Sequence, residues 1–456
     1  MDNQSTSSAM TRIKSLLDEF SFVEIGALVQ ARSTDFNMAE KKAPSDGVIT
    51  GYGTIDGNLV YVYAQDAAVL GGSMGEMHAR KIANLYDMAM KMGAPVVELI
   101  DCSGIRLQEA CDALYGFGRI YHKKTLASGV VPQISAIFGT CGGGMAVLTA
   151  LSDFVLMEDS KAKLFVNAPD AVQGNKDEKI AGAASQAENG AVDFRGTEED
   201  IFNEIRRLVS VLPANNEVTD TYEDCTDDLN RSVAGIDKMD AAEAAAQIAD
   251  NGIFIETRKE YSSDVVTGFI KLNGQTVGVV ANKDPELRFK GAKKAAKLVN
   301  FCDAFELPVL TLASVTSYHN CEHNEKNIAK ASAELASAYS NASVPMVTVV
   351  KNAYGTAGLT MGSKALGIDM VYAFADAKIG VMDAKKAVEI IYDESPADAA
   401  KVKEFDENQN SALAAARRGY VDDVIKAEET RQRVIAALEM LYTKSVYRPE
   451  KKHGTV

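Results

Sequence analysis

Apolar and polar residues alternate along the chain with two different periods, and the two periods follow each other in a fixed order. Residues 48–65 alternate at every second position around Asp56-Gly57, which is typical of a β-hairpin. Residues 78–92 repeat apolar side chains at helical spacing, and an apolar run then opens at Pro95. A second helix leads to a strand that ends in a glycine-rich turn, and another helix follows. Strands that alternate with helices predict an α/β fold with a parallel core.

This order of elements occurs twice. The hairpin segment V48-I-T-G-Y-G-T-I-D-G57 returns as V265-V-T-G-F-I-K-L-N-G274, an offset of 217. The strand openings at Pro95 and Pro308 are 213 positions apart, and the strands leading to the two turns keep the same offset. An offset this constant over roughly 100 residues indicates an internal duplication.

The duplication predicts two domains, one over residues 1–235 and one over residues 236–456. The acidic stretch 173–235 has few apolar runs, so we expect it to be an elaboration of the first half. Within it, the pattern over Thr197–Leu208 predicts a helix.

Residues 125–152 carry no charged side chain and could be mistaken for a membrane-spanning helix. A span needs about 20 mainly apolar residues, whereas Pro132, Gln133 and four glycines interrupt this one. The pattern instead predicts a buried strand over Val130–Phe138, a glycine turn and a buried helix over Met145–Leu151.

Composition limits the classes of function. The chain is 46% hydrophobic and 24% charged, which is ordinary for a soluble protein. Its net charge of −15 argues against nucleic acid or an acidic membrane surface as the main partner. The six cysteines have no regular spacing, and the N-terminal residues are polar without an apolar signal core. We therefore expect reduced thiols and a cytoplasmic location.

The turns that close the last strand of each repeat are the strongest chemical signal. The first glycine turn, G139-T-C-G-G-G-M145, stands between an apolar strand and an apolar helix, and the second glycine turn, Y354-G-T-A357, holds the same place in the second copy. Backbone N–H groups that begin a helix after such a turn can bind a phosphate or a developing oxyanion. Two related turns suit a reaction between two partners that each contain a carbonyl group. Alternatively, the glycines only allow the strand and the helix to pack closely. No dinucleotide or P-loop fingerprint is present.

Conventional catalytic side chains are scarce. His319 and His323 have the i, i+4 spacing of a zinc helix, but no glutamate follows His319 and the segment before it is not helical in pattern. We expect no metal site. Arg80 and Lys81, on the helix after the G71-G-S-M-G75 loop, are candidates for binding phosphates, and a solvated helix face is an equally good interpretation.

Several segments closely resemble the carboxyltransferase subunits of biotin-dependent enzymes, which include acyl-CoA carboxylase beta chains and subunits of sodium-pumping acyl-CoA decarboxylases. The similar segments are D46-G-V-I-T-G-Y-G-T-I-D-G57, G71-G-S-M-G-E-M-H-A-R-K-I82, D101-C-S-G-I-R-L-Q-E109, L126-A-S-G-V-V-P-Q-I-S135, A353-Y-G-T-A357, S363-K-A-L-G367 and the run 377–391. The resemblance covers roughly residues 10–445 and is stronger in the first half.

The resemblance implies tandem crotonase-like domains, each a ββα spiral, with an acyl-CoA site in the first and a biotin site in the second domain of a partner subunit. Gly143 and Gly144 would hold the thioester enolate, and Thr356 and Ala357 the ureido oxygen of biotin. Further candidate binding residues are Gly104, Arg106, Arg80, Gly355 and Tyr318.

The implied partners are a separate biotin carrier protein, a biotin carboxylase or a membrane decarboxylase subunit, and further copies of the chain as a dimer or hexamer. The quartet Ala89-Met90-Lys91-Met92 looks like the biotin-accepting site of a carrier, but Lys91 falls off the apolar stripe of its helix, so the chain is not expected to carry biotin itself.

The sequence departs from the family pattern on the biotin side. Thr356 stands where the family has glycine, the family's D-x-P-G-F loop reads Ser314–Tyr318, and two family histidines are Gln186 and Asp193. The main hypothesis is an active carboxyltransferase subunit. The alternatives are a non-catalytic companion subunit and a biotin-independent acyl-CoA hydrolase or lyase.

Overall fold

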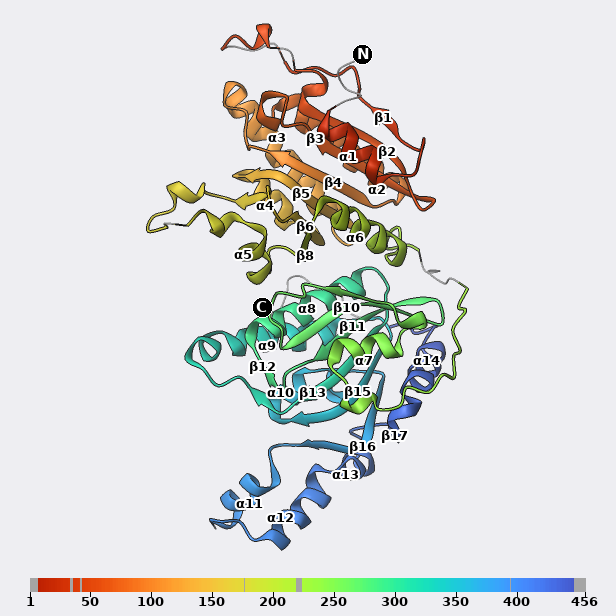
Figure 1. Cartoon of the computed structure of the whole chain (residues 1–456). Coiled ribbons are helices and arrows are strands. Elements are labelled where there is room, and N and C mark those ends of the chain that lie inside the picture. The colour runs from red at the N-terminus through yellow and green to blue at the C-terminus, as the bar shows by residue number, and fades with distance from the viewer. Residues whose placement is uncertain are drawn as a thin grey trace. The chain divides into compact units, whose positions relative to one another are not determined.

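The computed structural model describes residues 7–32, 36–41, 43–175, 177–218, 224–393 and 395–446. Within them the chain forms two compact units, Met1–Thr219 and Asp220–Val456, and each is built around one large sheet with helices packed against it (Figure 1). The α/β class expected from the pattern is confirmed.

In the first unit the strands follow the order β1-β2-β3-β4-β5-β6-β8, and β7 pairs with β5. Pairing is antiparallel from β1 to β3 and parallel from β3 to β8. The strands are β1 (Val23–Ile25), β2 (Val48–Ile55), β3 (Asn58–Gln65), β4 (Val96–Cys102), β5 (Gln133–Gly142), β6 (Phe154–Glu158), β7 (Lys163–Phe165) and β8 (Phe194–Gly196). The helices are α1 (Ser8–Leu16), α2 (Glu76–Met92), α3 (Ala110–Ala127), α4 (Gly144–Ala150), α5 (Ala183–Glu188) and α6 (Glu198–Val211).

The second unit repeats this plan in the order β17-β16-β15-β13-β11-β10-β9, with β12 and β14 forming a separate short pair. Its strands are β9 (Phe254–Thr257), β10 (Val265–Leu272), β11 (Gln275–Asn282), β12 (Glu286–Leu287), β13 (Val309–Val315), β14 (Ser317–Tyr318), β15 (Met346–Tyr354), β16 (Met370–Gly380) and β17 (Asp423–Ile425). Its α-helices are α7 (Ala241–Ile248), α8 (Phe289–Ala304), α9 (Glu322–Asn341), α10 (Gly355–Thr360), α11 (Ala384–Tyr392), α12 (Ala399–Phe405), α13 (Ala412–Arg417) and α14 (Thr430–Met440).

Local sequence signals place many of these elements. Asp56-Gly57 and Asn273-Gly274 both take positive φ at both positions, which closes the tight hairpins β2–β3 and β10–β11. β4 and β13 begin directly after Pro95 and Pro308. The helix predicted over Thr197–Leu208 is α6, which Thr197 caps through a reciprocal pair of hydrogen bonds with Asp200.

The duplication extends to single backbone pairings. Met74 pairs with Ile105 in the first unit, and Leu287 pairs with Tyr318 in the second. Both partners are displaced by 213 positions, so the loop that follows β4 and the loop that follows β13 take the same course.

The first glycine turn is shorter than the sequence suggests. β5 continues through Gly139 to Gly142, and the chain turns only at Gly143 before α4 begins. Glycine is needed at position 139 for close packing within the sheet, because a Cβ there would overlap the Asp101 carboxylate of the adjacent strand. The buried strand expected over 130–138 is confirmed, although it begins at Gln133. The helix expected over 145–151 forms as α4, but it is only partly buried, because Val147 and Leu151 are exposed.

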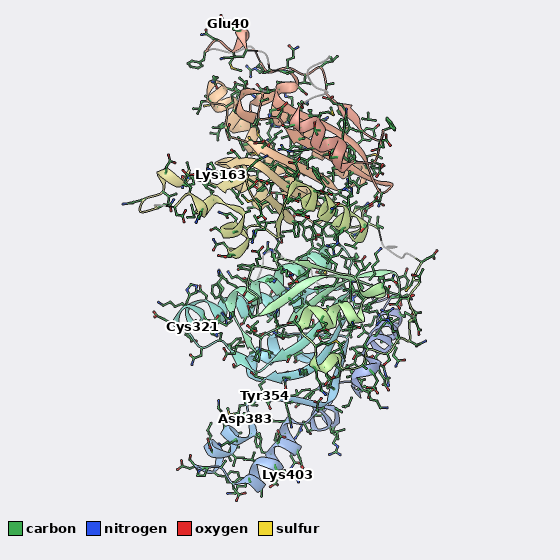
Figure 2. The ribbon with its side chains drawn as sticks, in the orientation of Figure 1. Glu40, Lys163, Cys321, Tyr354, Asp383 and Lys403 are labelled. Carbon is green, nitrogen blue, oxygen red and sulfur yellow. The ribbon has the colours of Figure 1, made fainter. Side chains whose placement is uncertain are left out.

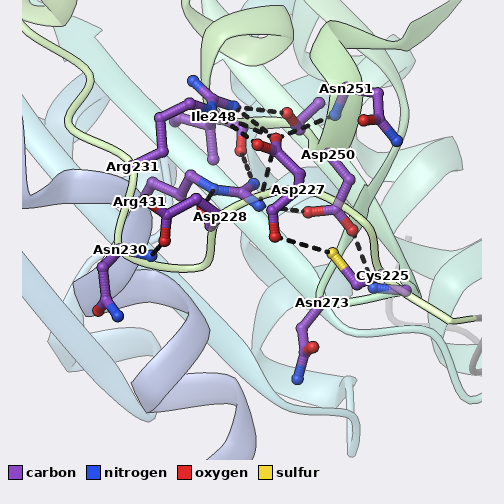
Figure 3. Close-up of polar contacts among 12 residues, drawn as sticks. Cys225, Asp227, Asp228, Asn230, Arg231, Ile248, Asp250, Asn251, Asn273 and Arg431 are labelled. Atoms are coloured by element: carbon purple, nitrogen blue, oxygen red, sulfur yellow. Dashed lines mark hydrogen bonds and ion pairs between the residues drawn. The ribbon is translucent and has the colours of Figure 1, made fainter.

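The second unit starts before residue 236, where the repeat pattern places the second domain. Arg431 of α14 is 0% exposed and donates to Asp250 at 2.6 Å, and its guanidinium lies 3.5 Å from Asp227 (Figure 3). Arg231 donates to the same Asp227 carboxylate at 3.0 Å. These contacts hold residues 224–231 against the second sheet, so this segment folds with the second unit (Figure 3).

One excursion departs from the common plan. α11, α12 and a π-helix over Asp406–Asn410 project away from the second sheet after β16 and return to it at α13 (Figure 1). In the part of the chain that the structure describes, no helix is long and apolar enough to cross a membrane.

Candidate active site

The first glycine turn is packed against α3 and against the strand β7. Gly143 takes φ 61° and ψ −124°, a conformation that favours glycine strongly. Its N–H donates to Phe165 O at 2.9 Å, and Tyr121 donates its hydroxyl to Gly144 O at 2.7 Å. A Cβ at Gly144 would lie 3.1 Å from the Phe117 ring, so glycine fits this position closely.

The amides that remain for a ligand are those that open α4. An α-helix offers no internal acceptor to its first N–H groups, so Gly144 and Met145 present theirs at the turn. Gly143 would reach the same ligand only by sharing its hydrogen with Phe165 O. Of the two predicted donors, Gly144 therefore has the freer amide, and Gly143 provides the backbone geometry.

The loop after β4 lies beside this turn. Gly104 has φ 115°, and a Cβ there would lie 3.4 Å from Gly142 O. Its carbonyl accepts from Met74 N, and Met74 O accepts from Arg106 N, both at 2.9 Å. The structure thus brings Gly104, a candidate binding residue, close to the first glycine turn.

Arg106 does not reach the surface of this site. Its side chain is 1% exposed and donates to Asp46, to Glu109 at 2.8 Å and to Ser73 O at 2.7 Å. Asp46 in turn accepts from His78 N at 2.7 Å. The buried guanidinium therefore holds the loop after β4 in place. Because Arg106 is buried, it does not contact a ligand directly.

Burial changes the ionisation of the groups around Arg106. It raises the pKa of Asp46, and the nearby Arg106 opposes that shift. Burial, with Arg106 nearby, lowers the pKa of His78 to about 3, so the imidazole is neutral at neutral pH. Asp46 and His78 are both buried, so neither can donate a proton at the protein surface, and their hydrogen bonds stabilise the core.

The two candidate phosphate-binding residues behave differently. Arg80 is exposed and donates to Glu76 at 2.9 Å within α2. Lys81 is buried, bonds Ser45 and Val48 O, and has its pKa lowered by burial to about 8. Arg80 stays available to a ligand at the cost of one surface ion pair, whereas Lys81 belongs to the core.

The second glycine turn is held more loosely. Gly355 takes φ 58° and opens α10, Thr356 is exposed and Ala357 is buried. α10 lies against β14, which carries the half-buried Tyr318. The residue that corresponds to Arg106 by the 213 offset is His319, which bonds Glu286 at 2.7 Å in a partly exposed pair.

A cavity of about 740 Å³ opens beside α10 in the second unit. Its walls are mainly glycine and aliphatic side chains from α10, β16 and residues 405–421. Gly355 and Leu359 of α10, Gly380 of β16 and Asn410 are among the residues that line it, and Gly380 pairs with Tyr354 directly before the turn. Tyr354 and Asp383 lie near the place where the excursion leaves the sheet (Figure 2).

The remaining predicted candidates take structural positions. Lys91 is an exposed residue in the last turn of α2, which confirms its helical assignment. His319 precedes α9, while His323 lies within it and packs its ring on Phe289, so the pair does not share a helix face. Gln186 donates to Leu164 O, and Asp193 accepts from Val155 N. Among the described residues no group of three or more His, Cys, Asp or Glu side chains could hold a metal ion.

Three residues near the turns were missed by the sequence. Asp46 lies within a segment similar to the family, but its partner Arg106 is 60 positions away. Tyr121 occupies a helix whose spacing gives no sign that its hydroxyl reaches Gly144. Asn410 stands in the polar run E407-N-Q-N410, which reads as a loop although Asn410 is fully buried.

Comparisons with known proteins match nearly the whole chain to one family. The family described as "Carboxyl transferase domain" matches residues 3–456. The propionyl-CoA carboxylase beta chain of Roseobacter denitrificans is 40% identical over 474 residues, covering 98% of this chain and 93% of that protein. The methylmalonyl-CoA decarboxylase subunit alpha of Propionigenium modestum is 38% identical, covering 100% of this chain and 95% of that protein.

A solved structure has the same fold. The transcarboxylase 12S crystal structure, described as a hexamer assembly with hydrolysed methylmalonyl-coenzyme A bound, matches with a TM-score of 0.94 and 36% identity. The match covers 98% of this chain and 92% of that one.

Proposed function

The chain belongs to the carboxyl transferase family, and we propose that its two glycine turns divide the reaction between them, the first holding an acyl thioester and the second the ureido ring of biotin. The protein is a biotin-dependent acyl-CoA carboxyltransferase, and the relatives include both carboxylase and decarboxylase subunits. The observation that carries the proposal is the repetition of one backbone plan with a glycine turn at the same place in each unit.

On the acyl side, the chain's task is to stabilise negative charge on the thioester oxygen. The N–H group of Gly144, at the opening of α4, would donate to that oxygen, and Gly143 would join it only by sharing the hydrogen that it donates to Phe165 O. Such a donor contributes about 3 kcal/mol to lowering the barrier. Tyr121 and the buried Arg106 hold the turn and the Gly104 loop before the substrate arrives.

On the biotin side, the cavity beside α10 fits a ring with an apolar body and few polar atoms. Gly355, Thr356 and Ala357 would hold the ureido oxygen through their amides, and Tyr318 would lie near that turn. Biotin, when bound, supplies a ureido nitrogen that carries the carboxyl group. That nitrogen would also handle the proton, so neither turn would need an acid–base side chain beside it.

Partners follow from the same proposal. Biotin would arrive on a separate carrier protein, with a biotin carboxylase or a membrane decarboxylase subunit as the third component. The chain would assemble with copies of itself, and the hexamer named for transcarboxylase 12S supports this. All six cysteines are free thiols, which supports a location in the cytoplasm.

The test uses the purified chain, a biotinylated carrier and malonyl-CoA or methylmalonyl-CoA. We expect carrier-dependent loss of the carboxyl group from one of these thioesters. Absence of any carrier-dependent transfer would contradict the proposal. Thioester hydrolysis or cleavage without a carrier would favour the biotin-independent alternative.

A further inference from the structure

A second cavity in the second unit lies where α8 and α9 begin. Its volume is about 380 Å³, and it shares no wall residue with the cavity beside α10. Arg288, Lys290, His319 and His323 contribute to its wall, and among the described residues that line it Glu260 supplies the one carboxylate. The chain as a whole has a net charge of −15, so this gathering of basic side chains is unusual for the molecule.

The two strongest bases in this wall lack an acidic partner. Within the part of the chain that the structure describes, the exposed guanidinium of Arg288 forms no ion pair and no hydrogen bond. The ammonium of Lys290 forms no ion pair there either, and its Nζ lies 5.5 Å from the centroid of the Tyr261 ring. Two neighbouring cations without a carboxylate create a local positive potential that attracts anions.

The corresponding place in the first unit is closed by ion pairs. There Glu109 accepts from the first N–H of α2 at 2.6 Å and from Arg106 at 2.8 Å, so one carboxylate neutralises both groups. In the second unit the neutral amide of Asn324 accepts from the first N–H of α8, that of Phe289, at 2.8 Å. The shorter His319 stands in the place of Arg106 by the 213 offset. The second unit therefore has open space and positive charge where the first has a buried ion cluster.

The acids near the cavity are occupied elsewhere. Glu286 bonds His319 at 2.7 Å. Asp264 is 1% exposed and accepts from the Arg288 N–H at 2.9 Å and from the Ser262 hydroxyl. The first turns of α8 and α9 both contribute to the wall, and the beginning of a helix favours a nearby anion.

We propose that this cavity binds a phosphate group, either as free phosphate or as the phosphate monoester of a small molecule. A phosphate carries between one and two negative charges near neutral pH and has several acceptor oxygens. The Arg288 guanidinium, the Lys290 ammonium and the exposed Ser263 hydroxyl supply matching donors at the wall. The site includes no residue of either glycine turn, so its ligand is additional to those of the proposed function.

Other ligand classes fit this wall less well. A metal cation would be repelled by Arg288 and Lys290. A single carboxylate would match one of the two cations and leave the other unpaired. A nucleic acid would meet the wider negative charge of the chain.

The experiment measures binding of inorganic phosphate to the full chain by titration calorimetry, with acetate at the same ionic strength as the comparison. We expect saturable binding of phosphate and binding of acetate that is at least about 10-fold weaker. Arg288→Gln removes a charged donor and should weaken phosphate binding by about 10-fold. Lys330→Gln removes an exposed cation of α9 that does not line the cavity, and should bind phosphate like wild type.

A matched pair at position 263 tests the charge of the wall directly. Ser263 is exposed, so both substitutions leave the core unchanged. Ser263→Asp places a carboxylate beside the phosphate and should weaken its binding by at least about 10-fold. Ser263→Asn has nearly the same shape without the charge and should retain most of the affinity.

Adenosine monophosphate distinguishes the two sources of the phosphate group. Tighter binding of the nucleotide than of inorganic phosphate, lost in Ser263→Asp, would assign the site to a phosphate monoester, and equal binding would assign it to free phosphate. Absence of saturable phosphate binding or equal binding of acetate would overturn the proposal. Unaltered phosphate binding in Arg288→Gln or Ser263→Asp, or an equal loss in Lys330→Gln, would overturn it too. None of these measurements needs acyl-CoA or a carrier, so their result is independent of carboxyl transfer.

Discussion

The two units repeat one order of strands and one course of loops, yet they support their glycine turns in different ways. In the first unit a fully buried arginine, Arg106, ties the loop beside the turn to Asp46 and Glu109. In the second unit the corresponding residue is His319, with one partly exposed bond to Glu286. The duplicated backbone plan therefore does not determine how firmly each site is built.

The second unit has its own buried arginine, but in another place. Arg431 joins α14 to Asp250 and to the segment around Asp227 (Figure 3). It stabilises the beginning of the unit instead of the loop beside the turn. The first site is thus held in shape before a ligand arrives, while the second combines a lightly held loop with an open cavity.

The largest difference between the units should appear in stability. Arg106→Met leaves Asp46 and Glu109 buried without their cation, and losing one partner of a buried pair costs about 3–5 kcal/mol. His319→Leu breaks a partly exposed pair that contributes about 0–1 kcal/mol. Urea unfolding of both variants and of wild type measures the two changes. Equal losses would show that the loops are supported alike.

The next prediction separates the acyl turn from simple packing. Gly144→Pro removes one amide donor at a position where helices tolerate proline, and should lower turnover by about 100-fold. Circular dichroism should show a folded protein. Gly144→Ala adds the same Cβ beside the Phe117 ring but keeps the amide, so it is the matched control and should keep far more of its turnover. Full activity in a folded Gly144→Pro protein would mean that the turn only packs.

The Asp227 carboxylate of the second unit gives a pH dependence. The hydrogen bond from Arg231, with Arg431 nearby, lowers the pKa of Asp227 to about 2 from 3.8. A lowered carboxyl pKa adds stability that is present above pH 3.8 and is lost as the pH falls towards 2. Asp227→Asn should therefore differ most from wild type at pH 5 and converge with it as the pH approaches 2.

Urea midpoints across this range measure that convergence. Asp228→Asn serves as the control, because among the described residues the Asp228 carboxylate accepts a hydrogen bond from the N–H of Asn230 and from no arginine. A constant gap between Asp227→Asn and wild type from pH 5 to pH 2 would contradict the assignment.

The smallest effect is expected at the second glycine turn. Thr356 stands where the family has glycine, but its side chain is exposed in the second unit. Thr356→Gly should raise turnover with free biotin by less than about 10-fold, since relief of local crowding contributes roughly 1 kcal/mol here. Turnover with the biotinylated carrier should change less, because the carrier adds its own contacts. Unchanged use of free biotin would remove threonine as the obstacle and question the placement of the ureido oxygen.

The sequence by itself determined the features that depend on neighbouring residues. Asp56-Gly57 closes its hairpin because both positions accept positive φ, and Pro95 marks the start of β4 because proline cannot continue a helix. The constant offset between the copies predicted the repeated sheet, and the glycine run 139–144 predicted a turn that the structure narrows to Gly143.

Only the tertiary structure decided which side chains meet. Arg106 and Lys81 are candidate ligand-binding cations in the sequence, yet both are buried. Their hydrogen-bond partners, Asp46 and Ser45, lie far away along the chain, so the sequence does not reveal these contacts. Position 139 needs glycine because the Asp101 carboxylate of the neighbouring strand occupies the space that a Cβ of residue 139 would take. Asn410 looks like a loop residue until β16 and the π-helix place it in a cavity wall. Local conformation follows from nearby residues, whereas burial and pairing depend on contacts between distant segments, and those form only when the sheet has assembled.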